Sequence, residues 1–482
     1  MKGLWTFAIT ASLLSACVEG LSFWKREDGP ARVVGFPVER ISVANPVKRD
    51  QLRKRANTAQ AILDNELTLY FANATLGTPA QTQRLHIDTG SSDLWVNTPN
   101  SKLCESNGSP CSVGGSYDAN SSSTYSYVGS YFSISYVDGS GASGDYVSDT
   151  LTIGTTSVRK LQFGVGYQST SNEGILGIGY EVNEVQVGRA GKSPYRNLPS
   201  QLVADGVINS NAYSIWLNDL DASAGSILFG GVDTDQFEGD LAILPIQSTS
   251  GVFAEFLITL TGVNLGSTVI AKNQAQAVLL DTGSSLTYLP DSMTEAIYEQ
   301  VGAQYDSSEG TAYVPCSLAA DTSVTLDFTF SSPTIRVGMD ELVIMVTSAN
   351  GRPLTFSDGR RACVFGIAPA GSGTAVLGDT FIRSAYIVYD LANNQIGIAQ
   401  TTFNATTNNI LEITSGTKSL PSATFVANAV SASAGVNDAQ ISGTVTLGLG
   451  ETATKNLAAQ TPAPVGFGAM AALAAGMAYA AM

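Results

Sequence analysis

The sequence predicts a mainly β protein made of two related halves, and three observations support this fold class. Of its 482 residues only 14% are charged, whereas 44% are hydrophobic and 48 are glycine, a composition that favours strands and turns over long surface helices. Apolar residues rich in aromatic and β-branched types form strand-like runs such as 67–71 and 386–389, between Gly and Asn turns. One sequence element also recurs in the second half, which predicts two equivalent β-rich lobes.

The composition also excludes several classes of function. The chain has one histidine, His86, so sites built from several histidines cannot form and most metal hydrolases are excluded. We therefore expect no metal and no cofactor. The net charge of −16 opposes binding to a phosphate backbone, so nucleic acid is not an expected partner.

The repeat joins an acidic residue to a glycine turn. Residues 85–92 read LHIDTGSS, and residues 278–285, which lie 193 positions later, read VLLDTGSS. Each copy is followed by a second apolar element that ends in glycine, at 175–177 and at 376–378. This order predicts two lobes of similar size that each carry one acidic loop.

The acidic loops indicate a shared catalytic centre. Asp88 and Asp281 follow apolar runs, where an ionised carboxylate is costly unless hydrogen bonds support it. The glycine after each permits a tight turn, and nearby Ser and Thr hydroxyls supply further bonds. If the lobes meet about a pseudo-twofold axis, the two carboxyls share one proton. One then activates a water as base while the other polarises a substrate carbonyl. The supporting residues are Thr89, Gly90, Ser91, Thr282, Gly283 and Ser284.

At these motifs the sequence resembles the pepsin-like aspartic proteases, and within them the fungal secreted and cell-surface branch called yapsins. The resemblance covers roughly residues 66–400. It implies a bilobal fold with the active site in the cleft between pseudo-twofold related lobes. It also implies that Asp88 and Asp281 are the catalytic pair and that Ser91 and Ser284 orient them. Peptides or proteins are then the substrates, and we expect a monomer.

The resemblance also assigns a flap. Tyr136 matches the flap tyrosine of the family and Trp95 the tryptophan that packs against it, although both could be ordinary core aromatics. Asp138 and Gly139 follow in the flap. Asp138 either favours a basic substrate residue before the scissile bond or only shapes the turn.

Two departures from the family pattern affect this region. Val137 stands where the family commonly has Gly, and residues 181–197 suggest an added surface loop. His86 shares a strand face with Asp88. Because the second copy has Leu279 at the equivalent position, we expect a packing or surface role for His86.

The N-terminus has the pattern of a secreted precursor. Lys2, an apolar run and small residues predict a signal peptide over 1–20. We interpret Leu14 to Cys17, which also matches a bacterial lipoprotein box, as coincidence. Residues 21–55 are expected to be a propeptide, because residues 1–55 carry ten basic and five acidic residues whereas the remainder has a charge of −21. Dibasic steps at 48–49 and 53–55 predict maturation after Arg55, unless they form an ordinary solvated charge run.

The rest of the chain divides into four expected segments. Residues 56–243 form the N-terminal lobe with the first catalytic Asp and the flap, and residues 244–400 form the C-terminal lobe. A Ser/Thr-rich stalk follows over 401–456, and a removable hydrophobic tail over 457–482. Small residues near Asn456, a spacer and the Ala-rich end predict a glycosylphosphatidylinositol (GPI) anchor. A plain low-complexity tail is the alternative.

The cysteines and sequons fit the secretory pathway. Without Cys17, four cysteines remain, and local pairing of Cys104 with Cys111 and of Cys316 with Cys363 is favoured over the two other pairings and over a zinc site. Glycosylation sequons occur at Asn73, Asn107, Asn120 and Asn404. The expected location is the cell surface, as a GPI-anchored protein of the membrane or wall, or the medium.

The expected function is therefore that of a secreted or cell-surface aspartic endopeptidase acting at acidic pH. Two other classes were weighed against it. A catalytically silent, pepsin-like binding or cell-wall protein would need a damaged motif, and both motifs are intact. A structural adhesin would rely on the Ser/Thr-rich tail, which is short beside the paired lobes.

Overall fold

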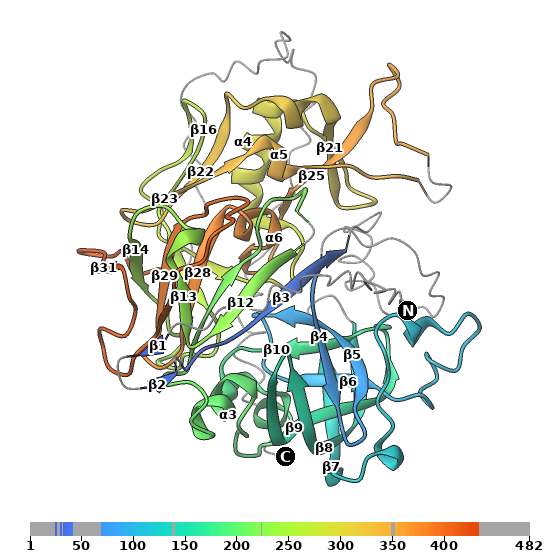
Figure 1. Ribbon diagram of the computed structural model, residues 1–482. Coiled ribbons are helices and arrows are strands. Elements are labelled where there is room, and N and C mark those ends of the chain that lie inside the picture. The colour runs from blue at the N-terminus through green and yellow to red at the C-terminus, as the bar shows by residue number, and fades with distance from the viewer. Residues whose placement is uncertain are drawn as a thin grey trace, which may run out of the picture.

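Figure 1 shows the computed structural model, in which strands dominate and helices are short. The structure describes residues 25–26, 29–30, 32–41, 69–136, 140–222, 224–348 and 352–432. The α-helices in these ranges are α2 (Val185–Gly188), α3 (Leu198–Ala204), α4 (Asp291–Val301), α5 (Met339–Leu342) and α6 (Asp379–Ile382). The 3-10 helices are η1 (Pro110–Ser112), η2 (Ala119–Ser121), η3 (Glu181–Asn183), η4 (Thr234–Gln236) and η5 (Cys316–Ala320). No helix in these ranges is long and apolar enough to cross a membrane.

One large sheet runs through the molecule and joins its two halves. Among the described residues it has fourteen strands. Their spatial order is β31 (Ala423–Phe425), β14 (Leu241–Pro245), β29 (Gln395–Gln400), β28 (Ala385–Asp390), β11 (Ala212–Trp216), β12 (Ala224–Phe229), β3 (Val34–Ile41), β4 (Leu69–Leu76), β5 (Gln81–Asp88), β10 (Gly174–Gly177), β6 (Leu94–Asn97), β9 (Thr156–Ser169), β8 (Gly141–Ile153) and β7 (Ser126–Ser135).

Smaller sheets form most of the C-terminal half, at the top of Figure 1. One has the order β15 (Leu257–Leu260), β18 (Gln276–Leu280), β27 (Ala375–Leu377), β19 (Thr287–Leu289) and β26 (Ile367–Pro369). A second has the order β17 (Thr268–Ala271), β16 (Gly262–Leu265), β22 (Thr325–Thr329) and β23 (Thr334–Gly338), and a third β20 (Gln304–Asp306), β21 (Thr311–Pro315), β25 (Ala362–Phe365) and β24 (Val343–Ile344). The remaining pairs are β13 (Gly231–Asp233) with β30 (Ile410–Glu412) and β1 (Lys25–Arg26) with β2 (Gly29–Pro30).

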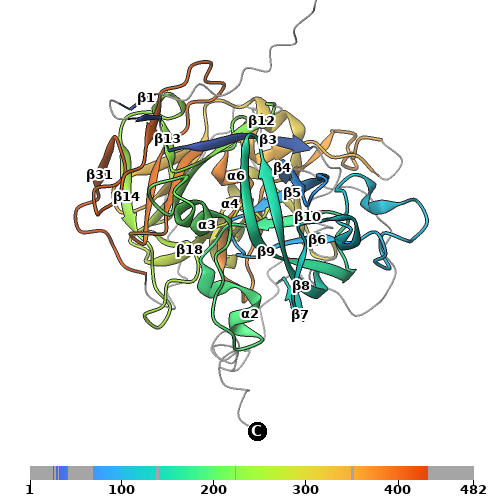
Figure 2. The same ribbon diagram turned by 60° about the horizontal axis from the view of Figure 1, so that its bottom comes forward.

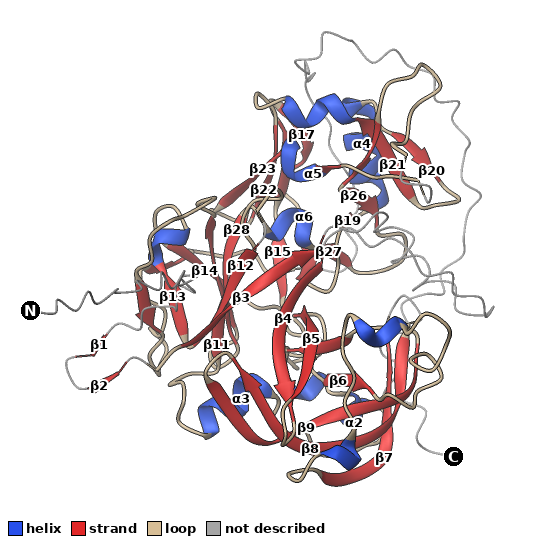
Figure 3. Ribbon diagram, turned by 45° about the vertical axis from the view of Figure 1, so that its right-hand side comes forward, coloured by secondary structure: helices blue, strands red, loops and turns tan. Residues whose placement is uncertain are grey.

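The repeated sequence elements have the same topology in both halves. β5, which ends at Asp88, pairs in parallel with β10, and β18, which ends just before Asp281, pairs in parallel with β27. β10 and β27 each pair on their other side with an antiparallel strand, β6 and β19. Two lobes of the same local design therefore carry the two acidic loops, as the repeat predicts, and Figure 3 labels one strand of each parallel pair, β5 and β27. The fold is the mostly β, bilobal one expected from the sequence.

The apolar residues of these strands form the core. The largest cluster of buried side chains includes Leu85 and Ile87 of β5 together with Val278 and Leu280 of β18. Burial of a side chain of this size contributes roughly 1.5–3 kcal/mol. The strands that hold the acidic loops are therefore among the most firmly packed parts of the protein.

The expected propeptide contributes a strand to the central sheet. β3 lies between β12 and β4, pairs antiparallel with both, and crosses the middle of Figure 1 as the dark blue strand. Phe36 and Val38 point into the core. The charge pattern led us to expect a basic segment that neutralises the acidic body. Residues 34–41 instead hold their place by strand pairing and apolar burial.

The structure differs from the sequence analysis beyond residue 401. A stalk was expected over 401–456, but residues 401–432 pack on the folded body. β30 pairs with β13, and β31 pairs in parallel with β14 at the edge of the central sheet. Ile413 and Leu420 are buried. These apolar residues are few and widely spaced, so the average Ser/Thr-rich composition concealed them.

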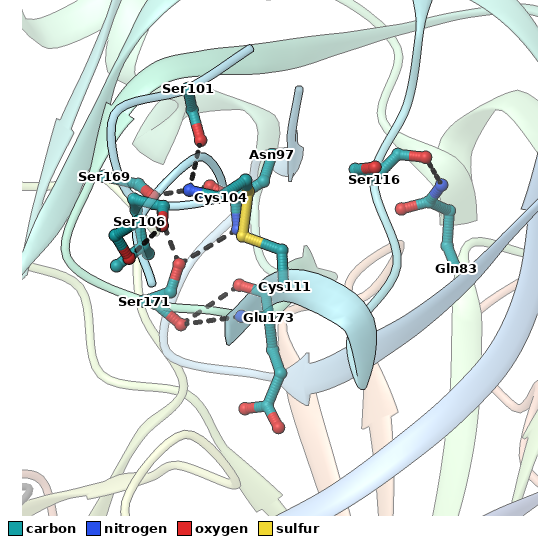
Figure 4. The surroundings of a disulfide bond; sticks show 11 residues. Gln83, Asn97, Ser101, Cys104, Ser106, Cys111, Ser116, Ser169, Ser171 and Glu173 are labelled. Atoms are coloured by element: carbon teal, nitrogen blue, oxygen red, sulfur yellow. Dashed lines mark hydrogen bonds between the residues drawn. A yellow bond between two sulfur atoms is a disulfide. The ribbon is translucent and has the colours of Figure 1, made fainter. Parts of the chain in front are cut away.

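Both disulfides join the locally paired cysteines. The Cys104–Cys111 bridge closes a short loop, and the Cys316–Cys363 bridge lies in the C-terminal half. Figure 4 shows the first bridge beside Asn97, whose side chain donates a hydrogen bond to the Ser171 carbonyl and accepts one from Ser169.

The four glycosylation sequons lie at exposed positions. Asn107, Asn120 and Asn404 are in turns or a short 3-10 helix, whereas Asn73 lies within β4 rather than in the surface loop that was expected. Residues 433–482, with the expected anchor signal, lie outside the described residues, as do residues 1–24 and Cys17 with them.

Candidate active site

Each acidic loop holds its carboxylate with the same pair of donors. Asp88 Oδ1 accepts the Gly90 N–H at 2.8 Å, and its Oδ2 accepts the Ser91 hydroxyl at 2.5 Å. Asp281 accepts the Gly283 N–H at 2.8 Å and the Ser284 hydroxyl at 2.7 Å. The carboxylate positions are thus fixed by the turn that follows each strand, because the donors lie two and three residues downstream.

The two loops meet so closely that each glycine lies against the opposite aspartate. A Cβ added to Gly90 would lie 2.5 Å from Asp281 Oδ1, and one added to Gly283 would lie 2.5 Å from Asp88 Oδ1. Any side chain at these positions would therefore displace a carboxyl group. The glycines are required for the approach of the two carboxyls as well as for the turns.

A symmetrical set of hydrogen bonds joins the loops. The Thr282 N–H donates to Thr89 Oγ1 at 3.0 Å, and the Thr89 N–H donates to Thr282 Oγ1 at 3.2 Å. Both hydroxyls then donate to strand carbonyls of the opposite lobe, Thr89 to Leu280 and Thr282 to Ile87. All four groups are buried, so these bonds hold the two carboxyls in one arrangement.

The electrostatics of the pair favour one retained proton. Burial and the negative charge of Asp88 raise the pKa of Asp281 to about 7, although the hydrogen bonds from Ser284 and Gly283 oppose the shift. Two adjacent carboxyls titrate as a pair, so at acidic pH one of them stays protonated. The pair can then supply an acid and a base at the same time.

The structure places two of the four expected flap residues. The Trp95 indole N–H donates to the Tyr136 hydroxyl at 2.7 Å, and both rings belong to one apolar cluster under β7. The Tyr136 N–H donates to the Ser140 carbonyl, which closes the turn between β7 and β8. Asp138 and Gly139 lie outside the described residues.

Sequence reasoning missed a buried carboxylate next to this cluster. Asp93 lies five residues after Asp88, and its Oδ1 accepts the hydroxyls of Tyr146 at 2.6 Å and Tyr195 at 2.9 Å. Its Oδ2 accepts the Val185 N–H at 2.9 Å. Its position directly before the apolar stretch 94–96 was a signal that such partners exist, because a buried carboxylate requires them.

A second missed carboxyl group, that of Glu255, is close enough to Asp281 to be influenced by its charge. β15 pairs antiparallel with β18, with Leu257 opposite Leu279, and the Leu280 N–H donates to the Phe256 carbonyl at 3.2 Å. Glu255 directly precedes Phe256, and Asp281 directly follows Leu280, so the two carboxyls lie in neighbouring segments. Burial and the charge of Asp281 raise the pKa of Glu255. No motif marked this residue, since only strand pairing brings it to the site.

The single histidine has a packing environment. His86 is buried on β5, and its ring lies 5.6 Å from that of Phe71 on the neighbouring strand. In the described part of the chain, no group of three or more His, Cys, Asp and Glu side chains could hold a metal ion.

Comparisons with known proteins agree on one family. The family model described as eukaryotic aspartyl protease matches residues 69–401. The chain is 55% identical over 437 residues to the probable aspartic-type endopeptidase opsB of Aspergillus oryzae, covering 89% of this chain and 88% of that protein. It is 38% identical to the secreted aspartic protease 4 of Candida albicans over 75% of this chain and 82% of that one.

A solved structure supports the fold alone. The aspartic proteinase from Irpex lacteus aligns with a TM-score of 0.57 at 23% sequence identity, covering 78% of this chain and all of that one. The family model covers both acidic loops and the strands that lead to them, and the relatives match over most of their length. The chain therefore belongs to the eukaryotic aspartyl protease family.

Proposed function

We propose that this protein is an aspartic endopeptidase that hydrolyses peptide bonds at acidic pH through Asp88 and Asp281. The observation that carries the proposal is the mutual approach of two carboxyls, each held by a glycine N–H and a serine hydroxyl and each packed against the glycine of the other loop. Relatives of the chain are named aspartic-type endopeptidase and acid protease, which supports peptide-bond hydrolysis.

The chemistry follows from the shared proton. In the proposed reactive state Asp281, whose pKa is raised to about 7 by burial and by the charge of Asp88, holds the shared proton, and Asp88 acts as the base. Asp88 removes a proton from water as the water oxygen bonds to the substrate carbonyl carbon, while Asp281 donates its proton to the carbonyl oxygen. Collapse of the tetrahedral intermediate breaks the C–N bond: Asp88 passes its proton to the leaving nitrogen, and Asp281 takes back a proton from one of the two hydroxyls, which restores the starting pair. Serine, glycine and threonine donors keep both carboxyls in place throughout.

The test is a pair of nearly isosteric substitutions. Asp88→Asn and Asp281→Asn should each abolish acid-activated, pepstatin-sensitive peptide cleavage in purified, matured protein, while the circular dichroism spectrum stays that of the wild type. More than trace activity in either variant would refute the assignment. A wild-type protein that folds and binds pepstatin but cleaves no peptide would point to the silent binding protein instead.

We further propose a preference for basic residues before the scissile bond, as the yapsin resemblance implies. The resemblance assigns Asp138 to the flap, and it follows Tyr136 by two residues in the sequence. Glu255 adds a half-buried carboxyl that is influenced by the charge of Asp281. In a partly shielded cleft a carboxylate attracts Lys or Arg more strongly than an exposed one does.

Secretion, a precursor and an anchor complete the proposal. The predicted signal peptide, the sequons and the two disulfides support passage through the secretory pathway. Replacement of Lys48, Arg49, Arg53, Lys54 and Arg55 by Ala should leave a longer, weakly active form, and normal activity would argue against processing there. If the tail carries a GPI signal, phosphatidylinositol-specific phospholipase should release active enzyme from cells. Enzyme found only in the medium with Met482 intact would exclude the anchor.

A further inference from the structure

We propose that Arg189 and Lys192 are positioning residues for the flap tyrosine, because the loop that carries them holds strand β7 in place. The loop comprises residues 184–196, includes α2, and is here called the flap brace. This inference rests on the proposed function only in that it takes Tyr136, which matches the flap tyrosine of the family, to contact the substrate. The contacts of the brace stand apart from that role.

Both ends of the brace are hydrogen-bonded to Asp93, a buried residue beside the cluster that contains Tyr136. The Val185 N–H and the Tyr195 hydroxyl, one near each end of the brace, both donate to the carboxylate of Asp93. The Tyr195 N–H also donates to Glu184 Oε2 at 2.8 Å, which joins the two ends to each other. A loop closed on itself and bonded to a buried carboxylate provides a rigid support.

The outer part of the brace contacts β7 through two cationic side chains. Arg189 Nη1 donates to the Ser133 carbonyl at 2.7 Å, and the Lys192 ammonium lies 4.6 Å from the centre of the Tyr131 ring. The first contact is a charge-assisted hydrogen bond and the second a cation–π contact. Figure 2 shows α2 beside β7, and the turned view of Figure 3 agrees.

Strand β7 needs such support because it ends the sheet. Among the described strands it pairs only with β8, and that pairing is interrupted by two register shifts between Tyr127 and Phe132. An edge strand with an irregular ladder opens more readily than an internal one. Ser133 lies three residues before Tyr136, beyond the second shift, so the bond from Arg189 holds the segment that leads into the flap.

The flap and the brace also share one apolar cluster. Tyr136, Val185 and Tyr195 pack against the buried residues Trp95 and Tyr146. Displacement of the brace would therefore move the surface on which the Tyr136 ring rests. The hydrogen bond from the Trp95 indole to the Tyr136 hydroxyl depends on this packing, since it joins the buried cluster directly to the flap tyrosine.

The brace predicts an effect on substrate affinity more than on the chemical step. Without Arg189 and Lys192, a smaller fraction of the molecules holds Tyr136 in the position that binds substrate. The apparent affinity for substrate falls in proportion to that fraction. The double variant Arg189→Ala with Lys192→Ala should raise KM about three- to tenfold and leave kcat within about twofold, because neither residue touches the catalytic pair. The single variant Arg189→Lys should keep most of the wild-type affinity, since an ammonium can also donate to the Ser133 carbonyl.

Arg196 provides the matched control. It is a third exposed cation of the same loop, and no hydrogen bond or ion pair joins it to β7 in the described part of the chain. Arg196→Ala removes the same charge and should leave KM unchanged. A rise in KM equal to that of the double variant would show a general charge effect and overturn the proposal.

Amide hydrogen exchange tests the brace without any activity. In the double variant, exchange should accelerate for residues 131–136, whereas exchange in β10 and β18 should stay as in the wild type. Equal exchange at 131–136 in both proteins would refute the brace, and faster exchange throughout would assign it a merely structural role. Because this measurement needs no substrate, failure of the proposed function and failure of the brace are distinguishable. Tyr136→Phe tests the role of the flap tyrosine separately through KM.

Discussion

Thr89 Oγ1 accepts the Thr282 N–H at 3.0 Å and Thr282 Oγ1 accepts the Thr89 N–H at 3.2 Å, and each hydroxyl donates to a strand carbonyl of the opposite lobe. The two acidic loops are thus joined by four buried hydrogen bonds, all of them made by the hydroxyl groups of these two threonines. Because each threonine serves both loops, loss of one hydroxyl affects both carboxyls. The position of Asp88 relative to Asp281 therefore depends on residues that do not themselves react.

The first prediction is that Thr282→Val lowers both stability and activity. Valine keeps the shape of threonine but leaves the Thr89 N–H and the Ile87 carbonyl without their partner, and each unsatisfied buried group costs about 1–3 kcal/mol. The midpoint of urea unfolding should fall, and kcat should fall with it. Thr282→Ser keeps the hydroxyl and is the control. Equal stability of the valine and serine variants would show that these bonds contribute nothing.

The second prediction concerns the alkaline limb of activity. The Ser284 hydroxyl lowers the pKa of Asp281, whereas burial and Asp88 raise it to about 7. Wild-type activity should therefore be lost as the pH rises through about 7, where the pair gives up its shared proton. Ser284→Ala removes a bond that favours the charged form, so the loss should move to higher pH while kcat falls. The measurement is the pH–rate profile of both proteins. If the alkaline loss of activity moves to lower pH in Ser284→Ala, the Ser284 hydroxyl does not favour the charged form of Asp281.

The sequence was most informative where two copies of one motif could be compared. The repeat predicted two lobes, and it named the two loops that the structure brings together at Gly90 and Gly283. It could not identify Glu255 or the Arg189 contact, because both depend on which strands become neighbours in space. The sequence predicted a stalk after residue 401, but residues 401–432 pack on the folded body. A few buried apolar residues, such as Ile413 and Leu420, are enough to hold a polar segment against an existing sheet.

The third prediction is that Glu184 makes the protein less stable as the pH rises. Burial raises its pKa from the ordinary 4.5 to about 10. The folded state therefore holds a proton that the unfolded state loses above about pH 4.5. Stability is full below that pH and declines progressively towards pH 10.

Glu184→Gln removes this proton uptake. The free energy of unfolding, measured from pH 5 to pH 8 in urea, should then decline less steeply than in the wild type. Glu181→Gln, which changes a partly exposed carboxyl of the neighbouring 3-10 helix, is the control. Parallel curves for the Glu184→Gln variant and the wild type would show that the buried carboxyl does not retain its proton.

The fourth prediction is that the segment after the family-matched region is part of the folded enzyme. Truncation after Thr401 removes β30 and β31, uncovers the β14 edge and deletes the buried residues Ile413 and Leu420. Loss of these two side chains alone corresponds to roughly 3–6 kcal/mol. Truncation after Ala432 keeps both strands and is the matched control. The protein truncated after Thr401 should unfold at a clearly lower temperature than the protein truncated after Ala432. Equal unfolding midpoints would show that residues 402–432 do not stabilise the fold, as expected of a stalk.

The last prediction is that the basic preference depends on pH through Glu255. Its pKa is raised by burial and by Asp281, so at the acidic end of the active range its carboxyl is neutral and does not attract Lys or Arg. As the pH rises through its titration the carboxylate forms, and the preference for basic residues should increase, about tenfold for each 1.4 kcal/mol of attraction. Profiling of a peptide library at several pH values, with wild type, Glu255→Gln and Asp138→Thr, separates the two acidic residues. Glu255→Gln should remove the pH dependence, and Asp138→Thr should lower the preference at the residue before the scissile bond. If the profile of the Glu255→Gln variant follows that of the wild type at every pH, Glu255 does not contact the substrate, and any basic preference then depends on the flap alone.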